Sequence, residues 1–135
     1  MPQSWLLKTE PETYSFEKLL REGTAVWDGV TNPLALKHLR TMKKGDFVLI
    51  YHTGKEKAVV GIAEIVSGPY PDPAEKDPKI VVVQLRGKSK LKNPVTLDRI
   101  KKTKEFAGFE LVRIPRLSVM PVPTGLRNRI LKMGR

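Results

Sequence analysis

Three apolar stretches in the middle of the chain constrain its fold more than any other feature. Residues 47–52, 58–66 and 80–85 are rich in β-branched, aliphatic and aromatic side chains, which favour strands. Residues 67–79 contain four prolines and are predicted to form a loop. No strand–helix–strand unit repeats along the sequence. The pattern therefore predicts an α+β fold, with a mixed, strongly bent sheet or small barrel flanked by short helices.

Shorter elements are predicted before these strands. Residues 4–8 have the composition of a buried first strand. Residues 14–21 fit a helix with Ser15 as N-cap, because apolar side chains recur on one face. Asn32 followed by Pro33 predicts the start of a second helix, with Asn as the cap and Pro at the first helical position.

The last third of the chain is predicted to alternate between extended and helical segments. Residues 86–92 are expected to extend the strand of residues 80–85 and then to form a turn. A helix is predicted from a cap at Thr96 to about Lys102, followed by a strand over residues 109–114. Residues 115–122 lie between prolines and should be extended. Thr124 is predicted to cap a last basic helix that runs through Lys132.

Length and composition place the chain among small folded proteins. Its 135 residues, of which 40% are hydrophobic, are enough for one core, so a single domain over residues 1–135 is expected. No apolar run approaches the roughly 20 residues of a membrane span, and no secretory signal is visible. The absence of cysteine removes disulfides and thiol chemistry. We therefore expect an intracellular, cytoplasmic protein without membrane contact.

The positive charge is confined to one part of the chain. Residues 1–83 hold 11 basic and 11 acidic side chains, whereas residues 84–135 hold 14 basic and 3 acidic ones and so carry the whole net charge of +11. A neutral half joined to a basic half favours a polyanionic partner over a merely solvated surface. Nucleic acid is the predicted partner. The candidate phosphate-binding residues are Arg86, Lys88, Lys90, Lys92 and Arg116.

The sequence holds no recognisable catalytic or metal-binding motif. His38 and His52 are its only histidines, and neither has partners at the spacing of a metal site. There is no glycine-rich phosphate loop. His52, Asp28 and Ser118 could meet as a triad, and Glu10 with Asp28 as an acid–base pair, but no spacing supports either arrangement. We expect no enzyme activity, no cofactor and no metal.

One short stretch, Val26-Trp27-Asp28-Gly29-Val30-Thr31-Asn32, combines groups that suit a flat polar ligand. Trp27 offers an aromatic face, whereas Asp28 and Asn32 offer hydrogen bonds to the edge of a base. Gly29 allows a sharp turn. The alternative is a core tryptophan followed by a turn that starts a helix.

Six separated motifs together resemble the EVE domain family, which belongs to the PUA-like superfamily and is related to YTH domains. They follow the order of that family almost from end to end. The motifs are Trp5-Leu6-Leu7-Lys8-Thr9-Glu10-Pro11, Trp27-Asp28-Gly29-Val30-Thr31-Asn32, Tyr51-His52-Thr53, Val60-Gly61-Ile62-Ala63-Glu64-Ile65, Tyr70-Pro71-Asp72-Pro73 and Arg116-Leu117-Ser118-Val119-Met120-Pro121-Val122.

The resemblance implies a PUA-like fold and a non-enzymatic pocket for a modified base, either modified cytosine in DNA or a modified base in RNA. It also implies a set of residues around that pocket. These are Lys8, Glu10, Trp27, Asp28, Asn32, Tyr51, His52 and Ser118, with Leu117 and Met120 as apolar walls.

The chain departs from the family after Val30. Members usually continue with Arg, Asn, Tyr and Gln, whereas this chain has Thr31, Asn32, Pro33 and Leu34. This difference favours Asn32 as a helix cap and leaves Trp27 and Asp28 as the main recognition residues. Two other hypotheses stay open: a general PUA-type RNA-binding module without modified-base selectivity, and an enzyme such as a nuclease or base-modifying hydrolase.

Overall fold

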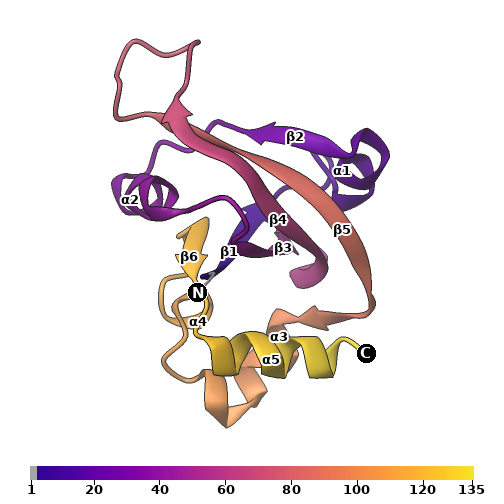
Figure 1. The fold of residues 1–135 in the computed structure, drawn as a ribbon. Helices are drawn as coiled ribbons and strands as arrows, with labels where there is room; N and C mark the ends of the chain where they lie inside the picture. The colour runs from indigo at the N-terminus through magenta and orange to yellow at the C-terminus, as the bar shows by residue number, and fades with distance from the viewer. Residues whose placement is uncertain (1–2) are drawn as a thin grey trace.

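A computed structural model describes residues 3–135 and shows a six-stranded sheet surrounded by short helices (Figure 1). The predicted α+β class and bent sheet are confirmed. In chain order the elements are β1 (Ser4–Thr9), α1 (Phe16–Glu22), β2 (Thr24–Trp27), α2 (Pro33–Thr41), β3 (Phe47–His52), β4 (Ala58–Pro71), β5 (Val81–Thr96), α3 (Leu97–Lys102), the 3-10 turn η1 (Lys104–Phe106), α4 (Glu110–Arg113), β6 (Val119–Pro121) and α5 (Thr124–Met133).

The strands lie in the order β2-β5-β4-β3-β1-β6. β1 pairs with β3 in parallel, and the other neighbouring strands pair antiparallel. β4 and β5 are 14 and 16 residues long, and their pairing shifts register at several points. Such irregularities bend strands, and Figure 1 shows this pair curving across the whole molecule.

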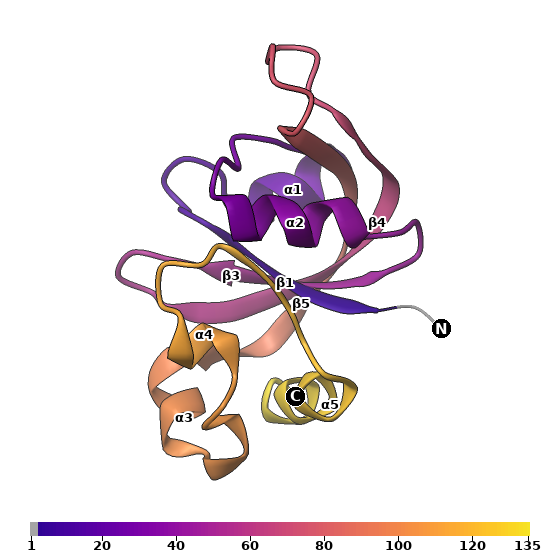
Figure 2. The same ribbon diagram turned by 90° about the vertical axis from the view of Figure 1, so that its left-hand side faces the viewer.

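Helices cover the sheet at two places. Figure 2 shows α1 and α2 together on one side of the strands, whereas α3, α4 and α5 gather at the end away from the loop between β4 and β5. The buried side chains of the sheet and helices form one apolar cluster. Among the helices of residues 3–135, none has the length and continuous apolar character that a bilayer crossing requires.

The predicted starts of the first two helices are confirmed by their caps. The Ser15 hydroxyl accepts from the backbone N–H of Lys18, and the Asn32 side chain accepts from that of Ala35. Gly61 lies at a bulge and at a close contact between two elements. The pairing of β4 shifts there, and a Cβ on Gly61 would lie 2.2 Å from the Phe16 ring, so α1 packs directly on the strand.

Other expectations were wrong in ways that have local causes. Residues 109–114 form helix α4 rather than a strand, because Arg113 and Ile114 donate their N–H groups to carbonyls four residues earlier. Residues 24–27, for which no strand was predicted, form strand β2, since β5 extends far enough to pair with them. Thr124 is the first helical residue of α5, and Pro123 occupies the cap position.

The observed bounds of β4 and β5 also differ from the predicted ones. β4 continues to Pro71, and so takes in part of the expected proline-rich loop. β5 continues through the basic segment to Thr96, which caps α3 by accepting from the N–H of Arg99. Long antiparallel pairing between these two strands therefore overrides the local turn signals.

Candidate base-binding pocket

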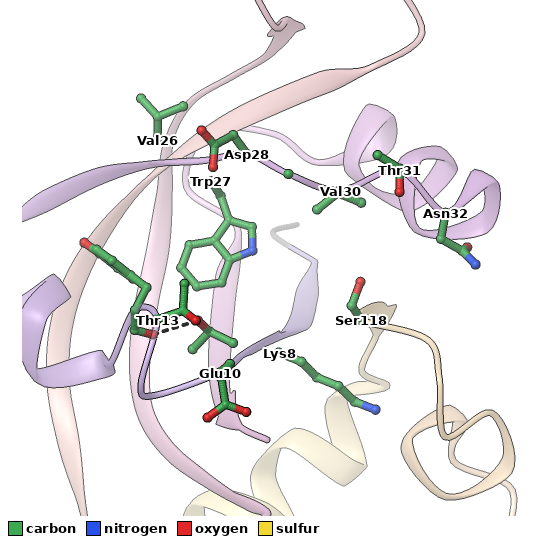
Figure 3. A pocket seen from close by; sticks show the side chains of 13 residues that line it. Lys8, Glu10, Thr13, Val26, Trp27, Asp28, Val30, Thr31, Asn32 and Ser118 are labelled. Carbon is green, nitrogen blue, oxygen red and sulfur yellow. Dashed lines mark hydrogen bonds between the residues drawn. The ribbon is translucent and has the colours of Figure 1, made fainter. Parts of the chain in front are cut away.

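A hollow of about 540 Å³ lies where β1 and β2 end and α2 begins. Figure 3 shows its side chains arranged around the ring of Trp27. The residues that line it come from four separate parts of the chain. They are Lys8, Thr9, Glu10, Thr13, Tyr14, Val26, Trp27, Asp28, Gly29, Val30, Thr31, Asn32 and Ser118.

Strand pairing brings these parts together. Ser118 precedes β6, and its carbonyl accepts a 2.9 Å hydrogen bond from the N–H of Lys8 at the end of β1. On the other side, Trp27 ends β2 opposite Val83 of β5. Gly29 has φ 77°, a left-handed conformation that lets the chain turn from β2 toward the cap of α2. The pocket is therefore built on strand ends rather than on long loops.

Trp27 forms a wall of the pocket and is itself mostly covered, with 8% of its surface exposed. The Tyr14 ring meets it edge to face, with 6.1 Å between centroids and 84° between planes. The indole N–H has no hydrogen-bond partner within residues 3–135, yet it is not among the fully buried unpaired atoms. It is therefore a donor that faces the pocket (Figure 3).

Tyr14 is held in place by its own hydroxyl. That hydroxyl donates a 2.5 Å hydrogen bond to Glu22 at the other end of α1. Burial raises the pKa of Tyr14, and the bond to the Glu22 carboxylate raises it further. Tyr14 therefore stays neutral at physiological pH and supports Trp27 as a fixed aromatic side chain.

Three further polar side chains leave hydrogen-bonding groups free around Trp27. Asp28 is exposed and makes no ion pair or side-chain hydrogen bond within the described residues. The Ser118 hydroxyl is likewise without a partner in residues 3–135. Asn32 uses its side-chain oxygen to cap α2, at 3.0 Å from the Ala35 nitrogen, and its amide NH₂ remains available as a donor.

Lys8 is the one cation among the lining residues. Its ammonium group donates a 2.7 Å hydrogen bond to the Pro115 carbonyl and lies 5.6 Å from the centroid of the Tyr51 ring. Burial lowers the pKa of Lys8. Glu10 stands near it at the rim and accepts a 3.2 Å hydrogen bond from Thr53. The pocket thus contains one lysine and two carboxylates, Glu10 and Asp28.

Four of the expected pocket residues lie outside this hollow. Leu117 and Met120 are buried in the core. Tyr51 lines a neighbouring hollow. His52 is 2% exposed, and both of its ring nitrogens are occupied, by the Phe16 N–H and by Glu56. His52 therefore has no nitrogen left to act as a base for Ser118, which removes the triad considered from the sequence.

The expected phosphate-binding residues of β5 also lie away from the pocket. Trp27 pairs with Val83, and β5 then runs away from the pocket, so that Arg86 stands opposite Thr24. Arg86 and Lys88 lie 3.5 and 3.6 Å from the Glu64 carboxylate, which partly neutralises them. Arg116 is exposed and stands two residues before Ser118.

Seven lining residues were not among the predicted pocket residues: Thr9, Thr13, Tyr14, Val26, Gly29, Val30 and Thr31. Thr31 and Val30 flank predicted residues and could have been found from that adjacency. Thr13 and Tyr14 could not, because only the fold shows that the turn before α1 reaches β2. Among residues 3–135 there is no cluster of three side chains that could hold a metal ion.

The sequence matches the family model described as EVE domain over residues 3–133. It is 32% identical to thymocyte nuclear protein 1 of Gallus gallus over 143 aligned positions, which cover 94% of this chain and 58% of the chicken protein. The Mus musculus protein of the same name is 33% identical, over 72% of this chain and 54% of its own length. The chain thus spans little more than half the length of these curated relatives.

Solved structures share the fold. Protein Atu2648 from Agrobacterium tumefaciens aligns with a TM-score of 0.94 and 35% identity, over 98% of this chain and 92% of its own. Human THYN1 protein, in complex with DNA that contains 5-methylcytosine, aligns with a TM-score of 0.91 and 27% identity, over 98% of both chains. The expected fold class and the expected family resemblance are both confirmed.

Proposed function

The chain belongs to the EVE domain family, and on that basis we propose that its pocket binds a modified base of a nucleic acid, with 5-methylcytosine in DNA as the first candidate. The observation that carries this proposal is the unpaired indole N–H of Trp27 on the wall of a hollow of about 540 Å³, with the unpaired Asp28 carboxylate at its rim (Figure 3). Ligand pockets typically measure about 300–1,000 Å³.

The free polar groups complement the edge of cytosine. Cytosine presents an amino group, which donates, beside a ring nitrogen and a carbonyl, which accept. In the pocket, the Asp28 carboxylate can only accept, whereas the Trp27 N–H can only donate. Ser118 and the Asn32 amide add further donors. This pairing of one acceptor with several donors supports a base with adjacent amino and acceptor groups.

Val30 gives the pocket an apolar part that suits a methyl group. Its side chain lies on the Trp27 side of the chain, whereas the Val26 side chain points to the opposite side (Figure 3). A C5-methyl group on a pyrimidine is read by apolar contact. Packing that methyl group against Val30 would remove apolar surface from water, which stabilises the complex.

Because the pocket is a recess built on strand ends, a base must leave its stack to enter. In duplex DNA this flipping costs a few kcal/mol, and it costs less in a single strand. We therefore infer that the chain is a single EVE domain and that it binds its ligand without turnover. It acts inside the cell, where its nucleic-acid ligand occurs.

The test is a binding panel with oligonucleotides that differ only in one 5-methylcytosine, as single strands and as duplexes, at two salt concentrations. We expect tighter binding of the methylated strand, with a ratio to the unmethylated strand that salt changes little, because the methyl contact is uncharged. Equal affinity for both strands, with steep salt dependence, would instead identify a general RNA- or DNA-binding module. Cleavage of the oligonucleotide, or conversion of its base, would show that the protein is an enzyme rather than a reader.

A further inference from the structure

A second hollow adjoins the base pocket and shares Lys8 with it. It has a volume of about 270 Å³, half that of the base pocket. Its walls come from the end of β3, the turn before β4 and the helix α3. The lining residues that matter here are Lys8, Tyr51, Thr53, Gly54, Lys57 and Lys101.

The two hollows differ in charge. The second hollow is lined by three lysines and by no carboxylate, although the Glu10 carboxylate lies against its Thr53 and Gly54, whereas the base pocket has one lysine and two carboxylates. Within the described residues, neither Lys57 nor Lys101 has a carboxylate partner within 4 Å, although the next residue, Lys102, lies 2.9 Å from Asp98. Both Lys57 and Lys101 are exposed. Their charge is therefore free to act on a ligand in this hollow.

Tyr51 makes this site suitable for a small anion rather than for a second base. Its side chain is only 3% exposed, so its ring offers no face for stacking. The hydroxyl has no hydrogen-bond partner within residues 3–135 and is not fully covered, so it opens into the hollow as a donor. Burial raises the pKa of Tyr51, which keeps that hydroxyl protonated at physiological pH.

We propose that this hollow binds a backbone phosphate next to the nucleotide whose base occupies the Trp27 pocket. Lys8 is the wall between the two hollows, so one nucleotide strand can place its base on one side of Lys8 and its phosphate on the other. This inference rests on the proposed function, and it replaces the β5 residues as the phosphate contacts. Lys57 and Lys101 supply the charge, and the Tyr51 hydroxyl donates a hydrogen bond.

The test compares two double variants of the full chain that lose the same charge. Lys57→Gln with Lys101→Gln changes the proposed site, whereas Lys90→Gln with Lys92→Gln changes two exposed lysines of β5 that have no carboxylate partner among the described residues. The probe is a single-stranded oligonucleotide with one 5-methylcytosine, titrated over a salt series. Two lost phosphate contacts should make the slope of log K against log salt less steep by about 1.4.

The β5 variant should leave the slope as in the parent chain. An equal loss in both variants would mean that the lysines act only through the overall field, and no loss in the Lys57/Lys101 variant would mean that the hollow is not used. Either result overturns the proposal. Circular dichroism of both variants establishes that they are folded.

A mononucleotide experiment separates the site from the rest of the strand. The parent chain should bind 5-methyldeoxycytidine monophosphate more tightly than the nucleoside, and the Lys57/Lys101 variant should bind both equally. If the Lys57/Lys101 variant still binds the monophosphate more tightly than the nucleoside, this hollow is not the phosphate site. If the parent chain binds methylated and unmethylated oligonucleotides equally, the proposed function fails, and the slopes of the two variants still decide the phosphate site.

Discussion

The backbone N–H of Phe16, the first residue of α1, donates a 3.0 Å hydrogen bond to Nε2 of His52, the last residue of β3. A backbone N–H only donates, so Nε2 must be the unprotonated ring nitrogen, and Nδ1 carries the proton toward Glu56 at 2.7 Å. His52 therefore fixes the start of α1 on the sheet. The turn just before α1 holds Thr13 and Tyr14, which line the base pocket.

We expect His52→Ala to weaken the fold while leaving base selectivity unchanged. The substitution leaves the buried N–H of Phe16 without an acceptor, which costs about 1–3 kcal/mol of unfolding free energy. Urea denaturation measures this loss, and the oligonucleotide panel measures the ratio of methylated to unmethylated binding below the unfolding range. If His52→Ala has the stability of the parent chain but no longer distinguishes the two strands, His52 takes part in recognition.

Asn32 has two roles that one pair of variants separates. Its oxygen caps α2, and its amide NH₂ is free to contact a base. Asn32→Ser keeps a good cap, so stability should change by less than about 0.5 kcal/mol, whereas Asn32→Ala should lose about 1 kcal/mol. Both variants lack the amide donor and should bind the methylated strand more weakly by a similar factor. Parental binding by Asn32→Ser would show that Asn32 is a cap alone.

Gly61 is predicted to be intolerant of any side chain. Gly61→Ala places a methyl group 2.2 Å from a ring atom of Phe16, which α1 holds against β4. We expect a loss of about 1–3 kcal/mol from overpacking. Gly125→Ala is the matched control, since no atom lies within 4 Å of its Cβ position. That change in helix α5 should be neutral or stabilising. Equal stabilities of the two variants would contradict the packing of α1.

The sequence predicted elements wherever a single local signal dominates. The strands β1, β3 and β4 carry apolar runs, and α1 and α2 begin at Ser15 and Asn32, whose side chains cap them. β2 was missed because only Trp27 of its four residues is buried, so its strand character comes from pairing with the distant β5. Such non-local pairing leaves no pattern within the segment itself.

Only part of the pocket was predictable, because the sequence does not show which face of a strand each side chain occupies. The resemblance to the EVE family pointed to Lys8, Glu10, Trp27, Asp28, Asn32 and Ser118, and the structure brings these residues together. His52 was included because it belongs to the motif Tyr51-His52-Thr53 of that resemblance. Successive side chains of a strand point to opposite faces, so His52 turns toward α1 while Tyr51 lies under Lys8. Only the structure fixes which face is which.

Stability should fall at mildly acidic pH because of His38. Burial lowers its pKa below the ordinary value of 6.5, nearby Lys37 lowers it further, and Glu110 opposes both. The unfolded chain therefore binds a proton at higher pH than the folded chain does. The stability that neutral His38 contributes is complete above pH 6.5 and is lost as the pH falls through the lower folded value.

The variant His38→Gln isolates this effect. Its unfolding free energy should depend less on pH than that of the parent between about pH 7 and pH 5, because Gln does not titrate. The two denaturation series should differ most at the acidic end, where the parent loses the contribution of neutral His38. If the two series run parallel over this range, the folded and unfolded pKa values of His38 are the same.

The last prediction concerns the donor on which the proposed function depends. Trp27→Ala is a poor test, because Trp27 is 8% exposed and packs on Tyr14, so its loss would cost about 3–5 kcal/mol of stability. Trp27→Phe retains an aromatic ring and removes the N–H. A hydrogen bond between neutral groups contributes about 0.5–1.5 kcal/mol, so binding of the methylated strand should weaken by roughly 2- to 13-fold. Val30→Ala, which removes apolar surface from the pocket wall instead (Figure 3), should reduce the preference for the methyl group and leave the affinity for unmethylated cytosine unchanged. Calorimetric titration of both variants with both strands therefore separates recognition of the base edge from recognition of the methyl group. Parental affinity in Trp27→Phe would mean that the indole N–H does not contact the base.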